Sequence, residues 1–181
     1  MTAARRLALV SFLLALVSLF LALATPIPLG AAPAPAPCSA PECHQFDFWI
    51  GRWDVFDPLG HVAGTNEITS ILGGCVLQEH WNGARGGSGQ SFNVYDASRG
   101  LWHQTWVDAQ GGLLVLEGGW RDGRMVLTGE RASRADPHVP VRNRITWTPL
   151  ARDTVRQYWD ASSDSGRTWT VQFDGRYVRR P

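Results

Sequence analysis

Short segments in which apolar and polar residues alternate make up most of the chain after Phe46. Alternation places successive side chains on opposite faces, so each segment predicts a half-buried β-strand. Clusters of glycine, aspartate, asparagine and serine between the segments predict turns. We expect roughly ten strands, near residues 52–57, 62–71, 76–82, 91–96, 101–108, 113–117, 125–130, 141–148, 154–161 and 168–179. No sustained helical period follows residue 45, although a single turn around residues 42–49 fits the pattern.

Turn signals and strand number together indicate the fold class. Asp122-Gly123 predicts a tight turn, because both residues tolerate positive φ. Asp174-Gly175 predicts either a second tight turn or, if the strand continues beyond it, a β-bulge. A meander of short antiparallel strands closes most naturally into a barrel, since closure removes exposed strand edges. The predicted fold is therefore all-β, a single antiparallel barrel of roughly ten strands.

One face of several predicted strands combines tryptophan with an amide or a carboxylate. Trp102, Gln104 and Trp106 share a face in this way. Aromatic walls with a few fixed polar groups are typical of a ligand cavity. The candidate binding residues are Trp53, Glu79, Trp81, Asn93, Gln104, Trp106, Arg144, Trp147, Gln157 and Trp159. The alternative is a packed core in which the rings fill volume and the amides satisfy one another.

The first residues have the pattern of an export signal. Arg5 and Arg6 precede an apolar run that ends in a small-x-small cleavage site at residues 22–24. The chain then divides into a signal peptide at residues 1–24, a proline- and alanine-rich linker outside the fold core at residues 25–45, and a barrel domain at residues 46–181. We therefore expect a periplasmic or secreted protein with no membrane span in the mature domain. A retained signal anchor is the alternative, since the apolar run nearly spans a bilayer.

Charge and composition remove several function classes. The 17 basic residues, all of them arginine, nearly balance the 16 acidic residues. A net charge of +1 lacks the basic excess that a nucleic-acid-binding protein needs to neutralise phosphates. The absence of lysine excludes Schiff-base and pyridoxal chemistry and the phosphate-loop nucleotide site.

Three cysteines in an exported chain allow one disulfide and one free thiol. Cys75 can pair with Cys38 or with Cys43, which would attach the segment before the domain to the barrel wall. A local bridge between Cys38 and Cys43 is the remaining disulfide alternative. No histidine or cysteine pair has the spacing of a zinc knuckle, so we expect no metal site.

Several motifs resemble known β-barrel proteins. The stretch from Phe46 to Val55, with Gly51-x-Trp53, looks like the opening of calycin-type barrels. The chain resembles a bacterial lipocalin-like family of unknown function more closely. The motifs that carry this resemblance are residues 71–75, Gln78-Glu79-x-Trp81, Tyr95-Asp96, residues 102–108 and Arg156-Gln157-x-Trp159. The resemblance covers about residues 46–180 and implies a lipocalin-like barrel and an exported location, without implying a reaction.

Haem is disfavoured by the positions of the histidines. Related ten-stranded barrels of the nitrobindin type bind haem through a histidine late in the chain. The histidines of this chain are His44, His61, His80, His103 and His138. None of them lies in the last two predicted strands, so we expect no haem and name no other cofactor.

One further motif predicts local structure only. Ser162-x-Asp164-x-Gly166-x-Thr168-Trp169 resembles the Asp-box hairpin of sialidase-type propellers. That motif repeats once per propeller blade but occurs once here. We therefore interpret it as a turn that joins the last two strands.

The leading functional hypothesis is an exported barrel that binds a small hydrophobic or amphipathic molecule. An enzyme is the secondary alternative and rests on Glu79, because a carboxyl group on an aromatic face has a raised pKa and can hold or deliver a proton. Arg144 would be its counter-ion if that side chain points inward. No Gly-x-Ser-x-Gly elbow or His-Glu-x-x-His helix supports an enzyme. An envelope scaffold or interaction protein with a fully packed barrel is the third class.

Overall fold

The computed structural model describes residues 36–133 and 135–181. The expected signal peptide and the expected linker up to residue 35 lie outside the described residues. Within the described part of the chain, no helix is long and apolar enough to cross a membrane.

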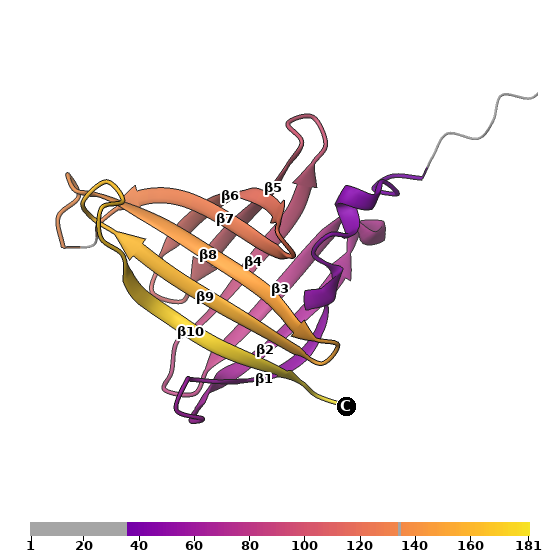
Figure 1. The fold of residues 1–181 in the computed structure, drawn as a ribbon, viewed down its shortest axis with the longest axis horizontal. Helices are drawn as coiled ribbons and strands as arrows, with labels where there is room; N and C mark the ends of the chain where they lie inside the picture. The colour runs from indigo at the N-terminus through magenta and orange to yellow at the C-terminus, as the bar shows by residue number, and fades with distance from the viewer. Residues whose placement is uncertain (1–35, 134) are drawn as a thin grey trace, which may run out of the picture. The chain divides into compact units, whose positions relative to one another are not determined.

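Ten antiparallel strands form a closed barrel (Figure 1). Neighbouring strands in the chain are neighbours in the barrel, and β1 closes the ring by pairing with both β2 and β10. The predicted all-β barrel of roughly ten strands is therefore confirmed. The strands are β1 (Gly51–Phe56), β2 (Val62–Ile71), β3 (Val76–Gly83), β4 (Ser88–Asp96), β5 (Leu101–Asp108), β6 (Leu113–Arg121), β7 (Arg124–Ala132), β8 (Pro140–Ala151), β9 (Thr154–Ser162) and β10 (Thr170–Arg179).

Burial along the strands follows a period of two residues. On β8, buried Asn143, Ile145 and Trp147 alternate with more exposed neighbours. On β2, buried Asn66 and Ile68 show the same alternation. Because successive side chains of a strand point to opposite faces, the buried set fills the barrel interior.

The two turn predictions had different outcomes. Asp122 and Gly123 both have positive φ, 48° and 76°, and form the tight turn between β6 and β7, as predicted. Asp174-Gly175 is neither a turn nor a bulge, because both residues pair in register with β9 inside β10. The bulge of β10 lies instead between Val171 and Phe173. A Cβ atom at position 175 would lie 2.5 Å from the Phe173 ring, so close packing explains this glycine.

The segment before β1 closes one end of the barrel (Figure 1, purple). It contains two short 3-10 helices, η1 (Pro41–His44) and η2 (Asp47–Trp49). Phe46 lies between them, and its ring centre is 4.9 Å from that of Trp49, 5.6 Å from that of Trp102 and 5.1 Å from that of Trp147. We call these four residues the aromatic plug. The plug is fully buried, so this end of the barrel is packed.

A disulfide attaches the same segment to the barrel wall. Cys38 is bonded to Cys75, which follows the short helix η3 (Leu72–Gly74) and precedes β3. This is one of the pairings left open above, and Cys43 is a free, buried thiol. Residues 36–45 were expected to belong to a linker outside the fold core. The disulfide and the buried Cys43 correct that expectation for this part of the segment.

Arg179, near the end of the last strand, holds the closing segment in place. Its Nη1 donates a hydrogen bond to the carbonyl oxygen of Ile50 at 2.6 Å, and Nη2 donates to that of Phe48 at 3.4 Å. The guanidinium lies 4.2 Å from the centre of the Trp53 ring. Gly51 leaves room for this contact, because a Cβ atom there would lie 2.1 Å from Nη1.

We predict that Arg179→Gln destabilises the barrel by about 2–3 kcal/mol, because it removes charge-assisted hydrogen bonds to two carbonyl groups and a cation–π contact. Urea denaturation measures the change. Arg52→Gln is the control, since Arg52 and its partner Glu67 form an exposed pair and such pairs contribute at most about 1 kcal/mol. Equal losses in the two variants would contradict the role assigned to Arg179.

Candidate functional site

A cavity of about 160 Å³ lies inside the barrel. Its lining comes from six strands, β3, β5, β6, β8, β9 and β10. The lining residues are Glu79, Trp81, Gln104, Trp106, Leu114, Ile145, Trp147, Gln157, Trp159, Gln172, Phe173 and Tyr177. Trp147 also belongs to the aromatic plug, so its side chain separates the packed end of the barrel from the cavity.

The lining has a polar part and an aromatic part at different depths. Glu79, Gln104, Gln157 and Tyr177 form what we call the polar floor, in which Glu79 is 4 % exposed and Tyr177 is 1 % exposed. Trp81, Trp106, Trp159 and Phe173 form what we call the aromatic rim and are only partly buried. The rim residues lie nearer the strand ends that face away from the plug. The cavity therefore reaches the surface between the rim rings, at the end of the barrel opposite the plug.

Glu79 is the centre of the polar floor. Its Oε1 accepts a hydrogen bond from Asn66 Nδ2 at 2.7 Å, and its Oε2 accepts one from Ser91 Oγ at 2.6 Å. These donors lie on β2 and β4, the two strands that flank β3. Each carboxylate oxygen thus has a protein donor on a neighbouring strand, as burial of the carboxylate requires.

Hydrogen bonds continue from Glu79 in both directions around the barrel wall. Through Ser91, the network reaches Asn93, whose Oδ1 accepts a hydrogen bond from Gln104 Nε2 at 2.7 Å. Asn66 also donates to the Tyr177 hydroxyl at 3.3 Å, and that hydroxyl donates to Gln157 Oε1. Seven side chains on six strands therefore form one buried network, which ties distant segments of the chain together.

Burial raises the pKa of the Glu79 carboxyl to about 7, although hydrogen bonds from Ser91 and Asn66 act to lower it. Burial also raises the pKa of the Tyr177 hydroxyl well above its ordinary value, and the charge on Glu79 contributes. Glu79 can therefore exchange a proton near neutral pH, while Tyr177 stays a neutral phenol.

Two rim rings lie close to glycines of neighbouring strands. A Cβ atom at Gly89 of β4 would lie 2.2 Å from the Trp106 ring, and one at Gly64 of β2 would lie 2.7 Å from the Trp81 ring. Only glycine permits such a close approach between a ring and a strand backbone. Trp159 is held by a hydrogen bond instead, since its Nε1 donates to Asn143 Oδ1 at 3.0 Å.

The structure brings seven of the ten candidate binding residues onto the cavity wall. They are Glu79, Trp81, Gln104, Trp106, Trp147, Gln157 and Trp159. Asn93 is fully buried and does not line the cavity, but its Oδ1 accepts a hydrogen bond from the floor residue Gln104. Trp53 is also fully buried but donates to the Trp49 carbonyl oxygen at 2.9 Å, beside the aromatic plug and away from the cavity.

Arg144 corrects one expectation, because it does not approach Glu79. It lies on the outer face of β8, where Nε and Nη2 donate to both carboxylate oxygens of Asp160 at 3.0 and 2.5 Å. The Arg144 guanidinium also stacks 4.2 Å from the centre of the Trp169 ring. Arg144 is therefore an outer-wall residue, and Glu79 has uncharged hydrogen-bond partners only.

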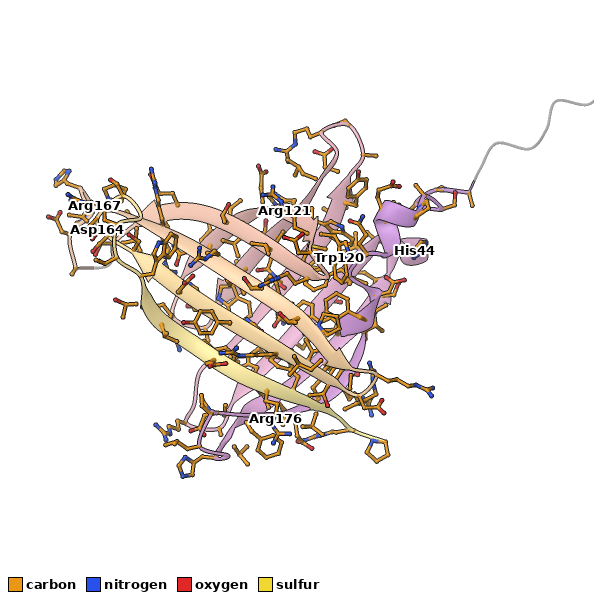
Figure 2. The ribbon with its side chains drawn as sticks, viewed as in Figure 1. His44, Trp120, Arg121, Asp164, Arg167 and Arg176 are labelled. Carbon is orange, nitrogen blue, oxygen red and sulfur yellow. A yellow bond between two sulfur atoms is a disulfide. The ribbon has the colours of Figure 1, made fainter. Side chains whose placement is uncertain are left out.

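The Asp-box-like motif forms the turn between β9 and β10, as predicted. Asp164 accepts hydrogen bonds from the backbone N–H of Arg167 and Thr168, both at 2.9 Å. Trp169 Nε1 donates to the Gly166 carbonyl oxygen at 3.1 Å. Figure 2 shows Asp164 and Arg167 at the end of the barrel opposite His44, outside the barrel interior.

Sequence reasoning missed several residues of the site. Asn66, Ser91 and Tyr177 each bond directly within the Glu79 network. Phe173 completes the rim. The turn or bulge expected at residues 174–175 hid the alternation that places Phe173 and Tyr177 on the inner face of β10. Reading residues 173–177 as one uninterrupted strand would have found both.

A scan against protein-family models finds no match, and a search of curated proteins finds no matching protein. The closed ten-strand antiparallel barrel is consistent with a calycin-like fold. Among residues 36–133 and 135–181, no group of three or more histidine, cysteine, aspartate or glutamate side chains is placed to hold a metal ion.

We predict that the stability of the protein falls by about 3 kcal/mol as pH rises from 4.5 to about 7, relative to the stability of Glu79→Gln. In this range the unfolded chain has released the Glu79 proton, near its ordinary pKa of 4.5, but the folded protein retains it. Folding therefore takes up a proton, and rising pH opposes folding until both states are ionised. Urea denaturation of both proteins at a series of pH values measures the difference. Parallel stability curves would contradict the burial of an ionisable group at Glu79.

Proposed function

We propose that this chain is an exported lipocalin-like protein that binds a small, partly apolar molecule in the barrel cavity. The observation that carries the proposal is the asymmetry of the interior: one end is packed by the aromatic plug, while the other holds a cavity of about 160 Å³. A cavity that buries apolar atoms against rings and orients them with a few polar groups is the general form of a small-molecule site.

The volume supports ligand binding over a packed scaffold. A packed barrel would leave space for a water or two, each needing roughly 10–15 Å³ of such volume. The cavity volume of about 160 Å³ is about ten times the volume that one water needs. Its rim rings are partly exposed, so a ligand would shield apolar surface from water.

The proposed export rests on two independent features. The arginine pair, apolar run and small-x-small site of the first 24 residues fit a signal peptide. The disulfide between Cys38 and Cys75 fits an oxidising compartment, where such bonds form and persist. Membership of the lipocalin-like family is likewise part of the proposal, supported by the closed barrel and by the motifs between residues 46 and 180.

One observation favours a second candidate function. Burial raises the pKa of Glu79 to about 7, which suits a group that exchanges a proton with a bound substrate. An enzyme of this kind would lose turnover in Glu79→Gln while keeping its fold and its affinity for a neutral substrate. A binding protein would have no turnover to lose.

We predict that the mature protein, purified under native conditions from cells that produce it, retains a small molecule. Native mass spectrometry should show an excess mass that disappears on denaturation. Trp106→Ala should lower the retained fraction about tenfold or more, because it removes a ring that forms the cavity mouth.

Trp120→Ala is the matched control, since Trp120 does not line the cavity. Its ring instead contacts Phe48, with 5.5 Å between ring centres. The control should retain the molecule as the unmodified protein does. Equal retention by the two variants, or a bare polypeptide mass for the unmodified protein, would contradict binding in this cavity.

A further inference from the structure

The lining of the cavity contains no basic side chain, although the chain has 17 arginines. Twelve residues line the cavity, and Glu79 and Tyr177 are the ionisable ones. No arginine or histidine is among them. Because Tyr177 stays neutral, the charge that the lining can carry is the negative charge of Glu79.

The charged acceptor that the polar floor offers to a ligand is the Glu79 carboxylate. The donors of Asn66, Ser91, Tyr177 and Gln104 are engaged with protein acceptors. A carboxylate has about four lone-pair sites, and Glu79 receives two hydrogen bonds. The amide nitrogen of Gln157 and the indole Nε1 of Trp147 are donors of lining residues that are not engaged in these bonds.

The walls above this floor are aromatic. Trp81, Trp106, Trp159 and Phe173 form the rim, and Trp147 closes the inner side. The faces of aromatic rings carry partial negative charge and attract cations, tryptophan most strongly. The floor and the ring faces therefore both favour a cation, and the guanidinium of Arg131 from β7 already lies 5.7 Å from the centre of the Trp159 ring.

The size of the cavity limits what can fit inside. An internal cavity of about 150 Å³ holds one benzene molecule. A cavity of about 160 Å³ accordingly accepts a single six-membered ring with a short polar arm, and a longer molecule would extend out through the rim.

We propose that the cavity selects a small aromatic cation, a single-ring molecule with a protonated amine on a short arm, with the ammonium group at Glu79 and the ring among the indoles of the rim. This inference rests on the proposed function, since it names the class of molecule that the cavity binds. The ammonium donates to the Glu79 carboxylate, and the rim shields the aromatic ring from water.

The position of Glu79 couples binding to pH. Asn66 from β2 and Ser91 from β4 donate to it, and Tyr177 from β10 is the titratable group that interacts with it. An ammonium ligand requires the ionised carboxylate, so binding displaces the Glu79 proton at low pH. With a pKa of about 7, affinity falls about tenfold for each pH unit below neutrality and levels off above it.

Three probes of matched shape test this selection: benzylammonium, benzyl alcohol and benzoate. Binding is measured by NMR titration of the indole N–H resonances of the cavity tryptophans. We expect benzylammonium to bind about ten- to hundredfold more tightly than benzyl alcohol, as for a hydrogen bond to a charged group, and benzoate to bind most weakly. The pH dependence is measured with benzylammonium between pH 5 and about pH 8, where its amine remains protonated.

Two variants locate the selectivity. Glu79→Gln should bind benzylammonium and benzyl alcohol equally, without a pH dependence. Asp160→Asn is the matched control, because Asp160 is also 4 % exposed but lies on the outer wall with Arg144. It should keep the full preference for the cation. Thermal melting of both variants confirms that they are folded.

The outcomes separate this inference from the proposed function. If the protein binds all three probes without a charge preference, the cation selectivity is wrong and the binding function stands. If the preference persists in Glu79→Gln, Glu79 is not its source and the inference is likewise overturned. If no probe shifts the cavity indole resonances, both the inference and the proposed function fail.

Discussion

Burial of the Glu79 carboxyl group is the constraint around which the barrel interior is organised. A carboxyl removed from water must receive hydrogen bonds from the protein, or the fold loses several kcal/mol. Its two direct donors come from the flanking strands β2 and β4, and their bonds continue to Gln104 and Gln157. A one-residue change in the register of any participating strand would turn its polar side chain to the outer face, so the network also specifies the strand pairing.

The two ends of the barrel differ in packing. At one end, the segment before β1 inserts Phe46 and Trp49, and Arg179 from the last strand fastens it through carbonyl oxygens. The chain termini of the barrel domain are thereby joined at the packed end. At the other end, glycines such as Gly89 let large rings lie against the wall without filling the centre. Packing at one end and open space at the other leave the polar floor between them, reachable from one side only.

Much of this arrangement was predictable from the sequence, because the face of a strand residue depends on a period of two. That period places Trp106 with Gln104, and Trp159 with Gln157, on one face. It also separates Arg144 from Trp147, so choosing Trp147 as inward should have excluded Arg144. Depth along the barrel was not predictable in the same way. Trp53 lies beside the plug and not in the cavity because its depth depends on pairing with β2 and β10, which no local pattern reveals.

The ionisation of Glu79 in the ligand-free protein tests this account most directly. Carbon-13 NMR of the glutamate carboxyl groups, followed through a pH titration and assigned by comparison with Glu79→Gln, reports the pKa of this side chain in the folded state. The account predicts a single glutamate that titrates at about 7, because its carboxyl group is buried among neutral partners. Titration of Glu79 near its ordinary value of 4.5 would show that the carboxyl is solvated, and would contradict the buried polar floor on which the proposed site depends.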